Sequence, residues 1–208
     1  MKRIIAWLAA LALLACCLPS APAEEETAAD WMMFASRTEP YYSEAAKAYT
    51  KPLYAGERIE AALSVSLSTG EETELSFSVP EDGLYELWFA YYTETQSALP
   101  SEMTVTLDGE IPFYELRRVK LKSLWMDDGV FPLDRYGNEI ATTPTAQRVL
   151  LECGIGDSAG WTDTPFLFEL AAGEHTLLLQ MQEGAVTLEG LSIRSRETPK
   201  AYAGQAAA

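Results

Sequence analysis

Histidine and cysteine are scarce in this chain of 208 residues, which contains one histidine and three cysteines. The histidine, His175, follows Gly173-Glu174 at the start of an apolar alternation, and no nucleophile lies near it in the sequence. A Ser-His-Asp or Cys-His catalytic device would need this histidine, so neither is indicated. A zinc site of the usual composition would need more histidine and cysteine ligands than the chain has.

Positive charge is also scarce, because 15 lysine and arginine residues stand against 31 aspartate and glutamate residues, for a formal net charge of -16. Nucleic-acid binding needs a basic footprint, so we expect no nucleic-acid partner. We expect no attraction to an anionic membrane surface, for the same reason. The simplest interpretation of the acidity is solubility outside a cell.

The first 23 residues have the pattern of a signal peptide. Lys2 and Arg3 precede an apolar segment, 4–18, that is too short to span a bilayer comfortably. Two cleavage interpretations remain open. Ala21-Pro22-Ala23 suits ordinary signal peptidase, whereas Leu13-Leu14-Ala15-Cys16 is similar to a lipobox and would leave a lipid anchor on Cys16. Both predict an exported bacterial protein, secreted or attached to the cell surface, with no other membrane contact.

Cysteine placement agrees with this organisation. Cys16 and Cys17 belong to the signal peptide, so Cys153 alone remains and no internal disulfide is expected. Its neighbours, Leu150-Leu151-Glu152, predict a buried thiol in a strand.

The remaining chain divides by composition into a polar leader at 24–40, a domain at 41–195 and a flexible tail or linker at 196–208. One short helix is predicted at 41–49, where Ala, Glu and Lys favour helix. Tyr42, Ala45, Ala46 and Tyr49 fall on one stripe of it, and this stripe predicts packing against the domain.

Apolar and polar residues alternate through most of the domain, which is typical of strands with one wet face. The segment 73–92 predicts a hairpin, because Leu75, Phe77 and Val79 precede a turn at Pro80–Gly83 and the apolar run 84–92 follows it. In that run the side chains of Tyr85, Leu87, Phe89 and Tyr91 would face one way and those of Trp88 and Tyr92 the other. Trp88 is expected in the core.

Further strands are predicted at 58–68, 103–107, 117–125, 166–170, 175–182 and 186–193, with a bulge at Gly190. About eight to ten short strands separated by glycine-centred turns predict an all-β fold. We expect a two-sheet jelly-roll sandwich with one short N-terminal helix.

Two irregular stretches, 126–147 and 154–165, interrupt the alternation, and long irregular inserts in compact domains are usually functional or disordered. They place aromatic rings among acids and amides. Sugars stack their C–H faces on such rings and bond acidic or amide groups through their hydroxyls. The predicted ligand-binding residues are Trp125, Asp127, Asp128, Tyr136, Asn138, Trp161 and Asp163. The alternative interpretation is that these rings close the ends of the sandwich.

Carboxylates in these loops also allow other interpretations. Oxygen-rich loops can hold calcium and paired carboxylates can hydrolyse glycosides, but no loop matches a calcium consensus and any acidic chain offers many pairs. We therefore expect no catalytic residues, no metal ligands and no cofactor, and we predict that the protein is not an enzyme.

Several segments resemble one family. They are Y-E-L-W-F-A-Y-Y at 85–92, L-W-M-D-D-G at 124–129, D-R-Y-G-N-E-I at 134–140 and P-F-L-F-E-L-A-A-G-E-H-T-L-L-L at 165–179. Their order resembles the N-terminal β-sandwich region of large bacterial extracellular solute-binding proteins that serve ABC-type sugar importers. The resemblance implies a galactose-binding-like carbohydrate-binding module at the cell surface, with a solute-binding domain or ABC permease components as partners.

The same resemblance bears on calcium. Arg58-Ile59-Glu60-Ala61 is similar to the start of calcium-stabilised carbohydrate modules, with only Glu60 matching the position that matters. It implies a structural calcium ion as the one alternative to having no cofactor.

Three functions follow as hypotheses. The leading one is an exported, non-catalytic carbohydrate-binding sandwich that is accessory to an ABC-type solute-binding protein. The first alternative is a structural or interaction domain without a sugar site. The second is a carbohydrate-active enzyme with two facing loop carboxylates.

Overall fold

The computed structural model describes residues 38–127, 129–160 and 162–197, and the fold below belongs to the compact unit that begins at Glu39. The predicted signal peptide, nearly all of the leader and most of the tail lie outside the described residues. So do two of the predicted ligand-binding residues, Asp128 and Trp161. Within the described ranges, no helix has the length and apolar character needed to cross a membrane.

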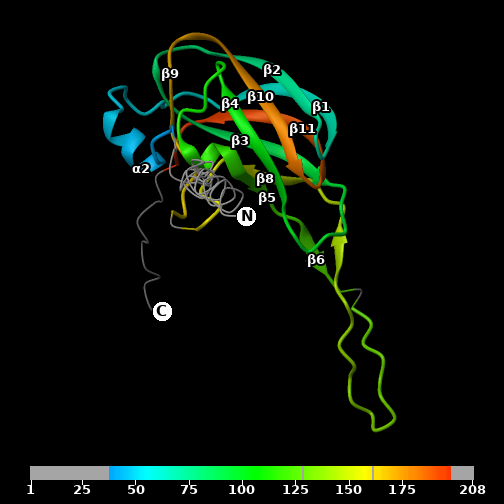
Figure 1. Cartoon of the computed structure of the whole chain (residues 1–208). Coiled ribbons are helices and arrows are strands. Elements are labelled where there is room, and N and C mark those ends of the chain that lie inside the picture. The colour runs from blue at the N-terminus through cyan, green and yellow to red at the C-terminus, as the bar shows by residue number, and fades with distance from the viewer. Residues whose placement is uncertain (1–37, 128, 161, 198–208) are drawn as a thin grey trace, which may run out of the picture. The chain divides into compact units, whose positions relative to one another are not determined.

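Two antiparallel sheets form the domain (Figure 1). The first has the order β1-β11-β3-β8, with bounds Ile59–Ser68, Ala185–Arg194, Gly83–Thr93 and Leu151–Gly154, and β9 (Phe168–Leu170) also pairs with β3. The second has the order β2-β10-β4-β5, with bounds Glu72–Val79, Gly173–Glu183, Ser101–Leu107 and Val119–Leu121. From β1 to β4 and again from β9 to β11, successive strands alternate between the two sheets, as in a jelly roll, so the predicted all-β sandwich is confirmed.

The core lies between the two sheets and is one contiguous cluster. The inner face of β3 carries Tyr85, Leu87, Phe89 and Tyr91, each at most 2% exposed. Trp88 was expected in the core, but it lies half-buried on the opposite face of β3, with the Arg194 guanidinium carbon 4.6 Å from its ring centroid. The alternation along β3 therefore selects the inner residues correctly and places Trp88 on the outer face.

The predicted hairpin at 73–92 is wrong. β2 pairs with β10 and β3 pairs with β11, so the turn at 80–82 carries the chain from one sheet to the other. The Tyr85 hydroxyl donates to the Glu81 carbonyl at 2.6 Å, and the Ala172 amide donates to the Asp82 carboxylate at 2.7 Å. Crossing between sheets lets the apolar faces of the two strands face each other across the core.

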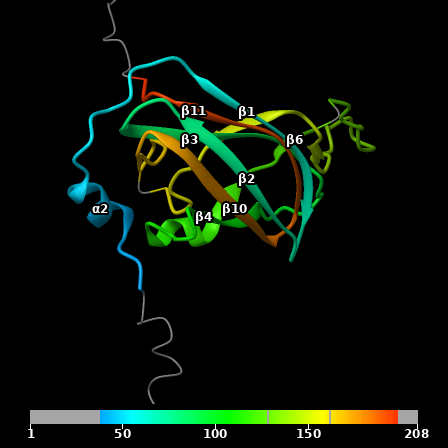
Figure 2. The same cartoon turned by 90° about the horizontal axis from the view of Figure 1, so that it is seen from above.

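The helical and irregular elements depart from the predicted bounds. The N-terminal helix is a single turn, α2 (Tyr42–Ala45), followed by the 3-10 turn η2 (Ala46–Ala48). Where a strand was predicted from Arg117, a second 3-10 turn, η3 (Tyr114–Arg118), precedes β5. Figure 2 shows α2 at the edge of the sandwich.

The long insert begins and ends in a two-stranded ribbon formed by β6 (Leu124–Met126) and β7 (Thr145–Gln147). We call residues 124–147 the arm. In Figure 1 the arm's connection runs outward from the ends of β6 and β7.

Three smaller predictions concern single residues. The register between β11 and β3 shifts between Leu188 and Gly190, which confirms the predicted bulge. Cys153 lies in β8, where it is half-buried and burial raises the pKa of its thiol. The His175 ring in β10 bonds Asp108 at 2.7 Å and the Ala171 carbonyl at 2.8 Å, as an ordinary strand residue would.

Replacement of Phe89 by alanine tests the importance of the inner face of β3. Removing a fully buried aromatic ring leaves a cavity, so we expect Phe89→Ala to lower the free energy of unfolding by about 3–5 kcal/mol. Urea titration followed by tryptophan fluorescence measures this change. Ser78→Ala on the exposed face of β2 is the control and should stay within about 0.5 kcal/mol of the wild type. Equal stability of the two variants would contradict the assignment of the core.

Candidate functional site

The predicted ligand-binding residues do not converge. Trp125, Asp127, Tyr136 and Asn138 belong to the arm, whereas Asp163 lies in the loop between β8 and β9. Figure 1 shows that the arm's connection runs away from this loop. The described members of the predicted set therefore occupy two separate regions.

Within the arm, local hydrogen bonds account for the positions of several of these residues. The Asp134 carboxylate accepts the Tyr136 amide at 2.7 Å, the Asn138 amide at 2.8 Å and the Asn138 side chain at 3.0 Å. These bonds, the Asn138 side chain first, lower the pKa of Asp134. Gly137 completes the turn with a φ of 84°. Asn138 thus closes a turn with Asp134, as Asx residues commonly do.

The other described members have varied surroundings. Trp125 is half-buried in β6, opposite Ala146. Asp127 is exposed and accepts the Thr142 hydroxyl at 2.9 Å. Tyr136 is 72% exposed, and the Arg135 guanidinium carbon lies 4.6 Å from its ring centroid. Asp163 is exposed. None of these arrangements tests ligand binding, so the set stays a prediction.

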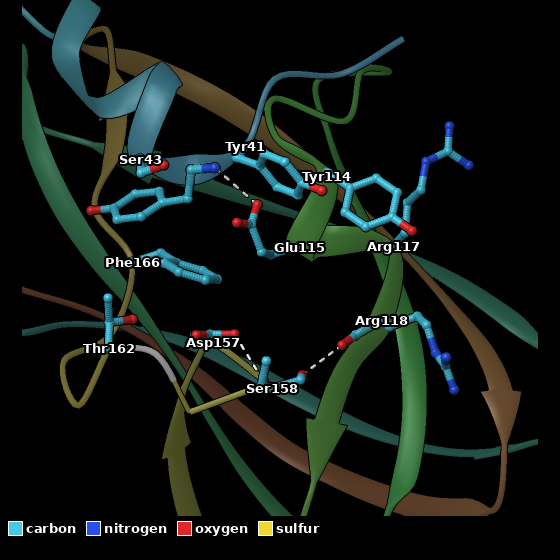
Figure 3. Close-up of a pocket in the computed structure, with 12 residues that line it drawn as sticks. Tyr41, Ser43, Tyr114, Glu115, Arg117, Arg118, Asp157, Ser158, Thr162 and Phe166 are labelled. Atoms are coloured by element: carbon cyan, nitrogen blue, oxygen red, sulfur yellow. Dashed lines mark hydrogen bonds between the residues drawn. The ribbon is translucent and has the colours of Figure 1, made fainter. Parts of the chain in front are cut away.

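A pocket of about 590 Å³ lies elsewhere, and we call it the tyrosine pocket (Figure 3). Three segments that are distant in sequence form it: the start of α2, the turn η3, and the loop between β8 and β9. Its lining residues are Tyr41, Tyr42, Ser43, Tyr114, Glu115, Arg117, Arg118, Asp157, Ser158, Ala159, Thr162 and Phe166.

Hydrogen bonds hold the start of α2 against η3. The Tyr42 amide donates to the Glu115 carboxylate at 2.9 Å, and the Tyr114 amide donates to the Pro40 carbonyl at 2.9 Å. Arg117 forms an ion pair with Glu39. The Glu115 carboxylate thus gives a partner to the Tyr42 amide, which has none within the helix.

A second set of hydrogen bonds attaches residues 42–51 to β9 and to Leu167, the residue directly before it. The Tyr49 hydroxyl donates to the Leu167 carbonyl at 2.9 Å, and the Leu167 amide donates to the Tyr42 hydroxyl at 3.0 Å. The Glu169 carboxylate accepts the Thr50 amide at 3.0 Å and the Lys51 amide at 3.1 Å. These bonds, that of the Thr50 amide first, lower the pKa of Glu169.

Packed aromatic rings form the base of the tyrosine pocket. The Phe166 ring lies 4.4 Å from Tyr42 and 5.0 Å from Phe113, between ring centroids. Phe113 and Phe166 are almost fully buried, so the base is fixed by the core. Such ring pairs add about 0.5–1.5 kcal/mol beyond their area burial.

Two further tyrosines flank the pocket with part of each ring in solvent. Tyr41 and Tyr114 are 44% and 41% exposed, and their centroids lie 5.8 Å apart in an edge-to-face arrangement. Each therefore offers apolar ring surface to a ligand while its partner restrains it.

Polar groups complete the rim. The Ser158 hydroxyl donates to the Arg118 carbonyl at 2.6 Å, which ties the β8–β9 loop to η3, and Asp157 accepts the Ala159 amide at 2.8 Å. Arg118 bonds the buried Glu102 carboxylate at 2.6 and 2.9 Å, and this bond raises the pKa of Arg118. The tyrosine pocket thus combines aromatic surface with carboxylate and hydroxyl groups.

Sequence reasoning missed most of this pocket. The helical stripe that contains Tyr42 predicts packing against the domain, and this is correct for Tyr42. Tyr41 lies in the same predicted helix, and no separate role is predicted for it. Tyr114 lies between the strands predicted at 103–107 and 117–125 and was assigned to neither. The available signal was the pair Tyr41-Tyr42 directly after Pro40 at a helix start, and nothing in the sequence joins it to Tyr114.

The described residues contain no group of three or more His, Cys, Asp or Glu side chains that could hold a metal ion. Glu60, the residue related by resemblance to a calcium ligand, is in an ion pair with Arg58. The presence or absence of calcium stays a prediction.

Comparison with known proteins gives matches only among solved structures, because no family model and no curated protein matches the chain. A family 35 carbohydrate binding module from Clostridium thermocellum aligns at 16% identity over 71% of this chain and all of its own, with a TM-score of 0.37. A Podospora anserina GH26-CBM35 β-(1,4)-mannanase aligns at 9% identity over 70% of this chain and 29% of its own, with a TM-score of 0.36.

A Paenibacillus cycloisomaltooligosaccharide glucanotransferase, complexed with cycloisomaltoheptaose, aligns at 16% identity over 69% of this chain, with a TM-score of 0.34. The aligned part spans 19% of that enzyme's length. Likeness at these identities and TM-scores assigns neither a family nor a ligand to this chain.

The attachment of the N-terminal segment by Glu169 can be tested with Glu169→Ala. Loss of the acceptor should increase the rate of hydrogen exchange at the Thr50 and Lys51 amides by about tenfold. This factor corresponds to the free energy of one hydrogen bond to a charged group. Glu174→Ala, a change at an exposed glutamate in β10, the next strand along the chain, is the matched control. Unchanged exchange in Glu169→Ala would contradict this role.

The same attachment should depend on pH. Because the folded state lowers the pKa of Glu169, its stabilising effect is present above the ordinary glutamate pKa of about 4.3 and is lost as the pH falls through the folded-state value. Protection of the two amides, corrected for intrinsic exchange, should therefore decline in acid.

Proposed function

We propose that this protein is an exported, non-catalytic carbohydrate-binding module and that the tyrosine pocket is its glycan site. The observation that carries the proposal is the pair of half-exposed rings, Tyr41 and Tyr114, beside a rim of carboxylate and hydroxyl groups. Aromatic faces match the C–H faces of sugar rings, while Glu115 and Ser158 offer hydrogen-bonding groups to sugar hydroxyls.

The fixed geometry of the pocket favours binding. Both half-exposed tyrosines belong to segments held by backbone hydrogen bonds, namely the start of α2 and η3. A ligand that stacks on them would order few side chains, so little of its interaction energy would be lost to conformational entropy. Small-ligand sites of about 300–1,000 Å³ commonly have such pre-formed, mostly apolar walls.

The proposal includes export by the predicted signal peptide and service as an accessory to an ABC-type solute-binding protein. This part rests on the sequence patterns and on the family resemblance. Its non-catalytic part rests on the sequence, which matches no catalytic motif.

A second candidate function, an interaction domain, is favoured by the arm. Several large apolar side chains of the arm are exposed: Leu124, Met126, Val130, Phe131, Leu133, Tyr136 and Ile140. Clusters of exposed apolar residues commonly mark interaction sites. The arm and the tyrosine pocket are built from different segments, so the two functions can be tested separately.

The glycan site is tested by screening the purified protein on an array of bacterial, plant and animal oligosaccharides. We expect binding to at least one neutral hexose oligosaccharide, and a loss of about two- to tenfold in Tyr114→Ala, because stacking on one aromatic ring contributes about 0.5–1.5 kcal/mol. Tyr136→Ala removes an exposed arm tyrosine and is the matched control. A wild-type protein that binds no glycan, or a loss in Tyr136→Ala alone, would overturn this site.

The interaction domain is tested by sedimentation of the wild type over a range of concentrations. If the arm associates with further copies of the chain, the apparent mass should rise with concentration, and Leu133→Ser combined with Ile140→Ser should abolish the rise. Leu99→Ser, an exposed apolar residue outside the arm, is the control. A constant monomer mass for the wild type would argue against self-association through the arm.

A further inference from the structure

The charged groups around the tyrosine pocket are arranged unevenly. What we infer from this arrangement rests on the proposed glycan site. Figure 3 shows the carboxylates of Glu115 and Asp157 beside the open centre of the pocket, whereas the guanidinium groups of Arg117 and Arg118 point away from it. A ligand in the pocket would therefore meet negative groups first.

The two arginines that line the pocket are already engaged. Arg117 is paired with Glu39, and Arg118 with the buried carboxylate of Glu102. These pairs raise the pKa of both arginines. Each arginine directs its Nε and one terminal nitrogen at its partner carboxylate. A ligand carboxylate would therefore meet only the remaining donors of a guanidinium whose charge is already offset by a neighbouring carboxylate.

The balance of charge points the same way. The carboxylates of Glu39, Glu102, Glu115 and Asp157 stand against the two guanidinium groups, and Lys120, 3.9 Å from Glu102, adds one more positive charge. The group of seven charges is therefore net negative by one, in a chain whose formal charge is -16. An anionic ligand would be repelled both locally and at a distance.

We propose that the tyrosine pocket is selective for uncharged glycans and rejects glycans that carry uronate at the bound sugar. The tyrosine rings contact the ring faces, which a hexose and its uronate share. Glu115 and Asp157 distinguish them by charge, since they can accept hydrogen bonds from a primary hydroxyl but repel a carboxylate. The pocket volume, about 590 Å³, limits the recognised part to a short segment of a glycan.

The experiment uses matched pairs on one array: neutral hexose oligosaccharides and the same oligosaccharides oxidised at C6 of the terminal sugar to the uronate. We expect the wild type to bind the uronate member of a pair at least about tenfold more weakly, with a smaller difference at high salt. Glu115→Gln keeps the side-chain length and an oxygen acceptor for the Tyr42 amide while removing the charge. It should reduce the difference within each pair by about threefold or more.

Glu189→Gln, which removes one carboxylate from the exposed face of β11, is the control for total charge and should leave the difference as in the wild type. Equal or stronger uronate binding by the wild type would overturn the inference while leaving the glycan site in place. A difference that Glu115→Gln leaves intact would overturn the role of Glu115. Binding to neither member of any pair would instead count against the proposed function itself.

Discussion

The structure depends on one constraint, which is that β3 must be paired along both edges and covered on its apolar face. β11 pairs along one edge of β3, while β8 and β9 share the other. The inner side chains from Tyr85 to Tyr91 then bury against the second sheet in one core. β3 therefore fixes the places of β8, β9 and β11 in the first sheet, and β1 is added at the far edge of β11.

This constraint also explains where the tyrosine pocket forms. β8 and β9 use different stretches of the same edge of β3, so the chain between them must leave the sheet and return. That loop carries Asp157 and Ser158, and Phe166 enters the core just before β9 begins. The N-terminal segment, held by Glu115 and Glu169, then closes the space that the loop leaves open.

Electrostatics and packing have separate roles at this site. The aromatic base belongs to the core, and its position is fixed by burial. The charged rim is held by ion pairs in which the guanidinium groups of Arg117 and Arg118 are largely exposed while their partners, Glu39 and Glu102, are mostly buried. Glu115 and Asp157, beside the open centre of the pocket, can therefore affect which ligands are accepted, whereas changes in the aromatic base or at the buried Glu102 also affect folding.

The sequence alone determined the all-β class, most strand positions and the inward residues of β3, because alternation depends only on which side chains avoid water. It also determined the bulge at Gly190 and the ordinary strand role of His175. Tertiary structure decided that β2 and β3 belong to different sheets, that the outer face of β3 leaves Trp88 half-buried, and that Tyr41 and Tyr114 line one pocket with Asp157. Those outcomes depend on pairing between segments far apart in the chain, and local periodicity contains no information about such pairing.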